Sequence, residues 1–195
     1  MVATLPERGI FMNINHQYNK LSTPSNEEKK IWSILETITD PEVPVLSILD
    51  LGIVRNIKLS QNSLLTGGGD GGIEIVITPT YSGCPAMDMI AMNIRLALLE
   101  NGFKNLKITT VLYPAWTTDW MSEEGKQKLK EYGIAPPNPR QQVCNNELFS
   151  PHEAVQCPQC NSYHTFRISE FGSTACKALY QCSDCKEPFD YFKCH

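Results

Sequence analysis

Four cysteines near the end of the chain have the spacing of a metal site. Cys157 and Cys160 form one Cys-x-x-Cys pair, and after a further 21 residues Cys182 and Cys185 form a second pair. In a zinc ribbon each pair lies on a tight turn, and the hairpin between the pairs brings the four thiolates to one ion. Zinc binds such a site more tightly than ferrous iron in the usual order of divalent metals. The spacing therefore predicts a four-cysteine Zn²⁺ site around which residues 151–195 fold.

A fifth cysteine, Cys84, ends a loop and precedes Pro85, a residue suited to the first position of a helix. A helix that begins at Pro85 would place the thiol near the positive end of its dipole. That position lowers the thiol pKa and favours the thiolate, the form that attacks electrophiles and binds metals. The alternative is a buried cysteine that acts as a small apolar residue. The position of Cys84 alone leaves both interpretations open.

Two carboxylates stand close together in the turn Asp40-Pro41-Glu42-Val43-Pro44. Asp40 and Glu42 could bind a hard metal ion or serve as an acid and a base. Residues of this kind more often cap turns and face water. The spacing indicates a candidate site without deciding between these roles.

Two further thiols outside the quartet are candidates for chemistry. Cys176 precedes Lys177, whose charge would favour the thiolate of Cys176. Cys194 lies next to the last residue, where it would be either a ligand or a bystander. Neither position is decisive on its own.

Composition indicates an ordinary globular chain in a reducing compartment. It has 195 residues, 42% hydrophobic and 19% charged, with a net charge of −4, and from residue 151 onward there are four basic and five acidic residues. A nearly neutral ribbon weighs against nucleic-acid binding, which requires basic surface. No apolar run reaches the length that spans a bilayer, and residues 1–20 do not resemble a secretion signal. We therefore expect a cytoplasmic protein without membrane contact, whose cysteines are ligands or reactive thiols and not disulfides.

The pattern of apolar residues predicts a small α+β domain before the ribbon. Ser25 and Glu28 form a capping box at the start of an amphipathic helix that Asp40-Pro41 ends. The glycine-rich segment 67–72 is expected to be a turn between two strands, because no Gly-Lys-Ser/Thr follows it as in a phosphate-binding loop. The expected elements are helices over 25–39, 85–101 and 122–132 and strands over 53–60, 73–77 and 106–113. This order gives a three-stranded sheet whose helices can cover one face.

Four regions follow from these patterns. Residues 1–24 are expected to be a flexible tail, and 25–132 the α+β domain. Residues 133–150, which contain three prolines, are predicted to be a linker. Residues 151–195 form the predicted zinc ribbon.

Several motifs resemble a known family of iron–sulfur assembly proteins. Segments 40–42, 50–54, 78–80 and 83–85, which read Asp-Pro-Glu, Asp-Leu-Gly-Ile-Val, Thr-Pro-Thr and Gly-Cys-Pro, are similar to the domain of SufT-type cluster assembly factors. One such domain followed by a four-cysteine ribbon resembles the PaaD (PaaJ) family, the D components of phenylacetyl-CoA epoxidase systems. Segments 171–180 and 187–194 are similar to that family in detail. The resemblance covers most of the chain apart from the tail.

The resemblance implies a role in phenylacetate degradation beside a di-iron oxygenase and an iron–sulfur reductase. These two epoxidase subunits would be the partners, and this chain would be a non-catalytic maturation factor. Cys84 would be the reactive or cluster-binding cysteine, with Asp40 and Glu42 beside it. One cysteine cannot complete a four-ligand cluster, so a homodimer, Cys176, Cys194 or a partner protein would have to contribute ligands. The implied cargo is a transient iron ion or iron–sulfur cluster, in addition to Zn²⁺ in the ribbon.

Two other functions compete with maturation. A docking subunit would use the ribbon and the tryptophans Trp116 and Trp120 to bind the oxygenase, with Cys84 as a structural residue. An enzyme would use Cys84 as a nucleophile, although no histidine stands in an obvious pairing position.

Overall fold

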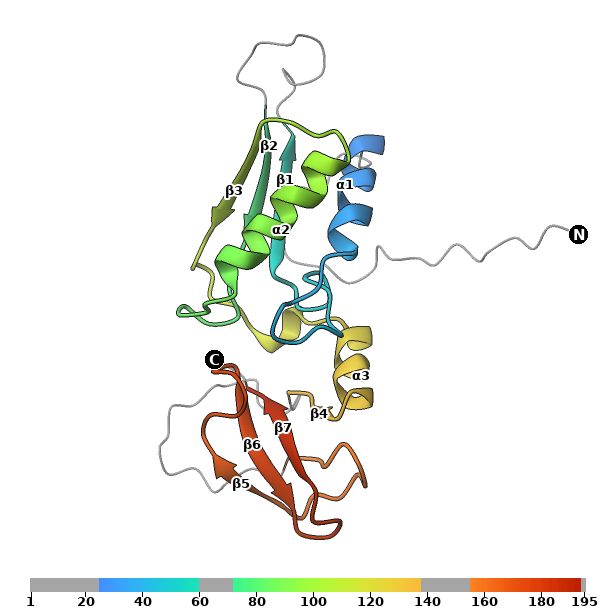
Figure 1. Cartoon of the computed structure of the whole chain (residues 1–195), viewed down its shortest axis with the longest axis vertical. Helices are drawn as coiled ribbons and strands as arrows, with labels where there is room; N and C mark the ends of the chain where they lie inside the picture. Colours follow the sequence, from blue (N-terminus) through green and yellow to red (C-terminus); the bar gives the residue numbers. More distant parts are fainter. Residues whose placement is uncertain (1–24, 60–71, 138–154, 194–195) are drawn as a thin grey trace, which may run out of the picture.

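The computed structural model describes residues 25–59, 72–137 and 155–193. The predicted tail, most of the glycine-rich turn, most of the predicted linker and Cys194 lie outside the described residues. Two sheets succeed one another along the long axis of the molecule (Figure 1). The fold is therefore α+β followed by a small β domain, as the sequence predicts.

The first sheet has the order β1-β2-β3. β1 (Val54–Leu59) and β2 (Ile73–Ile77) are antiparallel, while β3 (Leu106–Thr110) runs parallel to β2. A parallel pair needs a crossover connection, and α2 (Met87–Glu100) supplies it (Figure 1). β3 is shorter than predicted because β2 ends at Ile77. The N–H of Val111 donates to the carbonyl of Ile77, and this is the last hydrogen bond between the two strands.

α1 (Asn26–Glu36) begins where the capping box predicts. The Ser25 hydroxyl accepts a hydrogen bond from the Glu28 N–H at 3.1 Å. Helical spacing in α1 and α2 presents an apolar face from each helix to the core of the first sheet. The buried residues of these two faces are Ile31, Ile34, Leu35, Ile90, Ile94 and Leu98.

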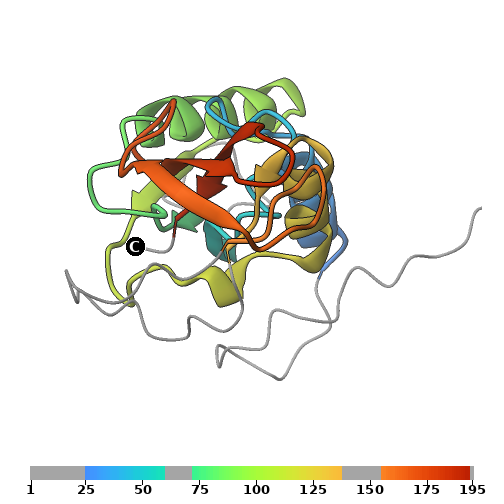
Figure 2. The ribbon, with the colours of Figure 1, turned by 90° about the horizontal axis from the view of Figure 1, so that it is seen from below.

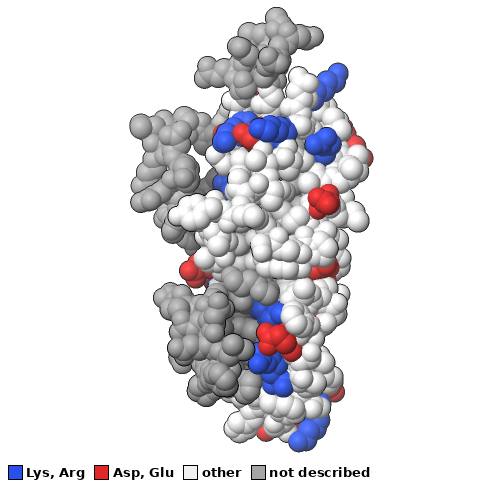
Figure 3. Space-filling model, turned by 90° about the vertical axis from the view of Figure 1, so that its left-hand side faces the viewer, with Lys and Arg blue, Asp and Glu red and all other residues white. Residues whose placement is uncertain are grey.

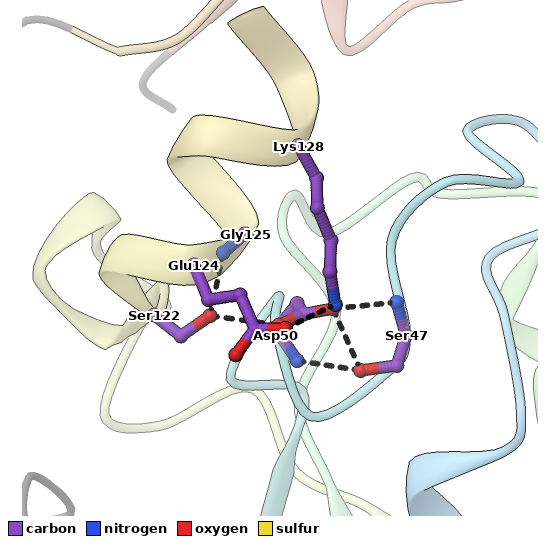
Figure 4. A network of polar contacts seen from close by, with 6 residues as sticks. All are labelled: Ser47, Asp50, Ser122, Glu124, Gly125 and Lys128. Atoms are coloured by element: carbon purple, nitrogen blue, oxygen red, sulfur yellow. Dashed lines mark hydrogen bonds and ion pairs between the residues drawn. The ribbon is translucent and has the colours of Figure 1, made fainter. Parts of the chain in front are cut away.

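α3 (Glu123–Glu131) is fastened to the first domain by a carboxylate network centred on Asp50 (Figure 4). Asp50 Oδ2 accepts from Ser47 and lies 2.8 Å from Lys128 Nζ, and Asp50 Oδ1 accepts from Ser122 Oγ. Ser122 Oγ also caps α3 by accepting from the Gly125 N–H. One buried side chain thus joins the turn before β1 to the start of α3.

The second sheet has the order β4-β7-β6-β5. β5 (Thr165–Ser169), β6 (Lys177–Cys182) and β7 (Pro188–Phe192) are antiparallel neighbours. β4 (Ile134–Ala135) lies at the start of the predicted linker and pairs parallel with β7. The two residues of β4, which follow α3 in the chain, are therefore part of the ribbon sheet.

The two domains pack directly against each other. Cys176 and Phe192 of the ribbon belong to the same buried cluster as the core of the first domain. The rings of Phe192 and Trp116 meet edge to face with centroids 6.2 Å apart, and Trp116 Nε1 donates to the Leu51 carbonyl. Figure 2 shows the molecule from below, with the ribbon sheet in front of the first domain. The interface is an extension of the main core.

On the face shown in Figure 3, basic and acidic residues are interspersed among wide uncharged areas. No helix within the described residues is both long and apolar enough to cross a bilayer.

Candidate metal sites

The four cysteines of the ribbon converge on one point. Their sulfur atoms all lie within 4.8 Å of one another, and this is the one group of three or more potential ligands at such distances in the described part of the chain. Cys157 Sγ is 3.7 Å from Cys185 Sγ, and Cys160 Sγ is 3.5 Å from Cys182 Sγ. A tetrahedral zinc ion with bonds of about 2.3 Å holds sulfurs roughly 3.8 Å apart. The donor set and its spacing therefore fit zinc.

The two turns that carry these cysteines have the same construction. The N–H of Asn161 donates to the carbonyl of Cys157, and the N–H of Lys186 donates to the carbonyl of Cys182. Asn161 and Lys186 each have a positive φ, of 61° and 68°. Each turn thus places a left-handed residue directly after its second cysteine and folds both thiols to the same side.

A polar contact outside the ligands links the two turns. Ser162 Oγ donates to Asp184 Oδ2, and His164 Nδ1 lies 3.2 Å from the same oxygen. The N–H of Ser183 donates to the His164 carbonyl. The Cys-x-x-Cys spacing gives no signal for His164 or Asp184, because they lie apart in sequence and meet across the hairpin.

Cys84 lies in a turn before α2. The helix begins at Met87 with Ala86 as its N-cap, two residues later than the sequence predicts. Burial and the nearby carboxylates of Glu42 and Asp40 raise the pKa of the half-buried Cys84 thiol, although the N–H groups of Ala86 and Met87 lower it. The prediction of a lowered pKa at the helix dipole is therefore wrong. Desolvation and two carboxylates outweigh the backbone donors.

Asp40 caps its own turn from a buried position. Its Oδ1 accepts from the N–H groups of Glu42 and Val43, both at 2.8 Å. The residue is only 8% exposed, so it caps a turn, as such residues often do, but does not face water. Burial raises its pKa, while the two backbone donors and the charge of Lys177 lower it. Asp40 thus fixes the direction in which Glu42 leaves the turn.

Glu42 meets a cysteine of the ribbon. Cys176 Sγ donates to Glu42 Oε2 at 3.7 Å and lies 3.0 Å from Thr174 Oγ1. Burial raises the pKa of Cys176 to about 11, and the Glu42 and Asp40 carboxylates add to the rise. Lys177 lowers this pKa, as predicted, but burial and the two carboxylates outweigh its charge, so the pKa of Cys176 is raised overall. The buried amine of Lys177 also lies 3.5 Å from Asp190 Oδ2.

Four predicted candidates therefore gather where the two domains meet. Asp40 and Glu42 come from the turn after α1, Cys84 from the loop before α2, and Cys176 from the position just before β6. On the ribbon side Glu42 also lines an open groove of about 490 Å³ together with Lys177 and Asp190. The sequence carries no signal for this groove, because its walls come from both domains.

Comparison with known proteins gives two family matches. Residues 28–102 match the family described as iron–sulfur cluster assembly protein, and residues 141–193 match the PaaD zinc beta ribbon domain. A protein of Escherichia coli (strain K12) named as the D component of 1,2-phenylacetyl-CoA epoxidase is 52% identical over 165 residues. That similarity covers 85% of this chain and 92% of the relative.

The first domain is also similar to single-domain proteins. An iron–sulfur protein maturation auxiliary factor of Porphyromonas gingivalis (strain ATCC BAA-308 / W83) is 35% identical, over 52% of this chain and 90% of the relative. A crystal structure of a domain of unknown function from Bacillus anthracis is 26% identical, with a TM-score of 0.45. The similarity covers 52% of this chain and 89% of the Bacillus anthracis chain. The chain belongs to the PaaD family, in which an iron–sulfur cluster assembly domain is joined to a zinc ribbon.

Proposed function

We propose that this chain is an accessory factor that holds iron, alone or in a cluster, at Cys84 and transfers it to the phenylacetyl-CoA epoxidase oxygenase or its reductase. One observation carries the proposal: the half-buried Cys84 thiol lies near enough to Glu42 and Asp40 for the charges of both carboxylates to raise its pKa. A thiol and carboxylates together suit a borderline metal ion such as Fe²⁺. The names of the relatives, an epoxidase component and iron–sulfur maturation factors, support the same function.

The raised pKa of Cys84 suits a carrier better than a permanent site. At neutral pH the thiol is protonated when no metal is bound, because burial and the carboxylates disfavour the thiolate. Metal binding must displace this proton, which lowers the apparent affinity. A site of modest affinity can pass its ion to a better-equipped site in a partner.

The ribbon site has a different role in this proposal. Four cysteines close the coordination sphere of a tetrahedral ion, so a zinc ion there has no open position for exchange or catalysis. We propose that this zinc is structural and holds the ribbon against the first domain. Both sites need reduced thiols, so we propose that the chain acts in the cytoplasm.

The test is the metal content of the partners after co-expression. Oxygenase and reductase would be produced with wild-type chain, with Cys84→Ser, or without this chain. We expect fewer iron atoms per partner both in its absence and with Cys84→Ser, while Ser82→Ala, an exposed change in the same loop, restores full loading. Partners that are fully loaded and active without the chain would overturn the proposal.

A docking subunit is the second candidate, and an exposed apolar row on α2 favours it. Met89, Met92, Leu96 and Leu99 follow one another at helical spacing, and each is about half exposed, between 47% and 56%. A purely docking role predicts a stable complex with full epoxidase activity when Cys84 is replaced by serine. The enzyme hypothesis has no comparable support, because His164, the one histidine among the described residues, lies in the ribbon.

A further inference from the structure

We propose that the iron cargo is bound across the domain boundary, by Cys84 and Glu42 of the first domain together with Cys176 of the ribbon. This inference rests on the proposed carrier function and names the second thiolate of its site. It also gives the ribbon a direct part in binding the cargo, in addition to its own zinc.

The position of Cys176 separates it from the zinc site. Cys176 precedes the first residue of β6, and Cys182 is the last residue of the same strand. At about 3.3 Å per residue, six residues of extended chain place the two cysteines roughly 20 Å apart. Cys176 packs in the core of the first domain, whereas Cys157 and Cys182 pack in the separate core of the ribbon. It therefore serves the domain interface.

The distance between Cys176 and Glu42 is that of two ligands on one ion. Sulfur and oxygen ligands bound at about 2.3 Å and about 2.1 Å to a tetrahedral metal lie roughly 3.6 Å apart. Cys176 Sγ and Glu42 Oε2 are 3.7 Å apart. Two of the three proposed ligands thus have the required spacing.

Cys84 is the third ligand because it packs against the same buried cluster that contains Cys176. The charges of Glu42 and Asp40 act on both thiols, and both thiols act on the Tyr81 hydroxyl. Within the described residues, only the ribbon quartet already lies within 4.8 Å, so the ion itself must draw Cys84 toward the Cys176–Glu42 pair. Cys84 is on a loop, where a small shift costs less than one within a strand.

The resulting ligand set suits an ion that is held and then released. Two thiolates and a carboxylate give fewer sulfur ligands than the ribbon site, and they leave a fourth position for a partner ligand or for Asp40. Binding one Fe²⁺ releases the protons of Cys84 and Cys176 to solvent, since both thiols are protonated in the empty site. Transfer reverses these steps when a partner takes the ion.

Cobalt binding tests the inference, because Co²⁺ bound to thiolates shows a charge-transfer absorption whose intensity follows the number of Co–S bonds. Zinc-loaded chain would be titrated with Co²⁺ without oxygen, and zinc would be measured in the same samples. Cys84→Ser and Cys176→Ser are each expected to lose about half of the absorption and to weaken Co²⁺ binding at least tenfold. Glu42→Gln should weaken binding and keep the absorption at saturation. Glu170→Gln removes a carboxylate that follows β5 and pairs with Arg167; this control should change neither the absorption nor the affinity.

The outcomes separate this inference from the proposed function. If Cys84→Ser abolishes the absorption and Cys176→Ser leaves both absorption and affinity unchanged, the two-domain site is wrong and the carrier function stands. If Cys176→Ser weakens binding without reducing the absorption per bound ion, Cys176 is a packing residue and the inference is also overturned. If zinc-loaded wild type takes up no Co²⁺, the inference fails, and the metal content of co-expressed partners decides the carrier function separately.

Discussion

At the scale of single residues, the chemistry of this protein is determined by what surrounds each thiol. Cys176 and Cys182 stand at opposite ends of one strand, yet burial and carboxylates raise the pKa of Cys176 to about 11, while N–H donors hold that of Cys182 at about 7. An ordinary cysteine has a pKa of about 8.5. The pKa of a cysteine is thus lowered at Cys182, in the second ribbon turn, and raised at Cys176, at the domain interface.

Alkylation of Cys176 tests this difference. The chain would carry zinc in the ribbon and no metal at the interface. Iodoacetamide would be added over a range of pH, and peptide mass spectrometry would follow the alkylation of Cys176. We expect the rate of alkylation to rise with pH, with a midpoint near 11. Glu42→Gln should move the midpoint down, because the carboxylate disfavours the thiolate. Lys177, Asp40 and Thr174 also face this thiol and are unchanged in that variant. A midpoint near 8.5 in wild type, the ordinary value, would contradict the environment described.

At the scale of elements, Asp50 decides where α3 lies. Its carboxylate accepts from Ser47 and Ser122 and pairs with Lys128, so it connects three segments. Burial raises its pKa, but the hydrogen bonds from Lys128, Ser122 and Ser47 outweigh burial and leave the pKa below its ordinary value. The charged form is therefore the one that stabilises the fold.

Asp50→Asn should lower the free energy of unfolding by about 2–3 kcal/mol at pH 7, since hydrogen bonds to a charged group are lost. A carboxylate with a lowered pKa contributes stability above its unfolded pKa of about 3.9, and that contribution is lost as pH falls through the folded pKa. Urea unfolding at pH 7 and below pH 4 should therefore show a smaller difference between wild type and variant at low pH. Glu123→Gln, an exposed change on the same helix, should have little effect at either pH. An equal loss for Asp50→Asn at both pH values would argue against the role of its charge.

Many of the helices, strands and turns could be predicted from the sequence, and the features that could not be predicted have physical causes. The capping box at Ser25 and the Cys-x-x-Cys pairs are local signals, so the start of α1 and the ribbon cysteines agree with prediction. The pKa of Cys84 depends on burial and on carboxylates that are about 40 residues away in the sequence, which no local pattern reveals. The meeting of Cys176 with Glu42 depends on how two domains pack, and the pairing of β4 with β7 depends on the same contact.

At the scale of the whole molecule, the zinc ribbon and the assembly domain form one continuous structure. Phe192 and Cys176 enter the core of the first domain, and β4 leads directly from α3 into the ribbon sheet. Metal in the ribbon should therefore affect the interface where the proposed cargo site lies, because an unfolded ribbon cannot keep Cys176 beside Glu42.

Removal of zinc tests this coupling. A strong chelator should unfold the ribbon, withdraw Phe192 from the Trp116 ring and expose the indole, which is only 3% exposed in the intact protein. Tryptophan emission should shift to longer wavelength, and the shift should be smaller in Trp116→Phe. Zinc loss without a change in emission would mean that the two domains do not depend on each other.

The measurement that tests the central claim most directly is the metal content of anaerobically purified chain, by elemental analysis with a visible spectrum, for wild type and Cys84→Ser. The account predicts about one zinc per chain in both proteins. It also predicts iron that is present in wild type and lost in the variant. Iron that stays unchanged in Cys84→Ser, with zinc still at one per chain, would contradict a carrier site at Cys84.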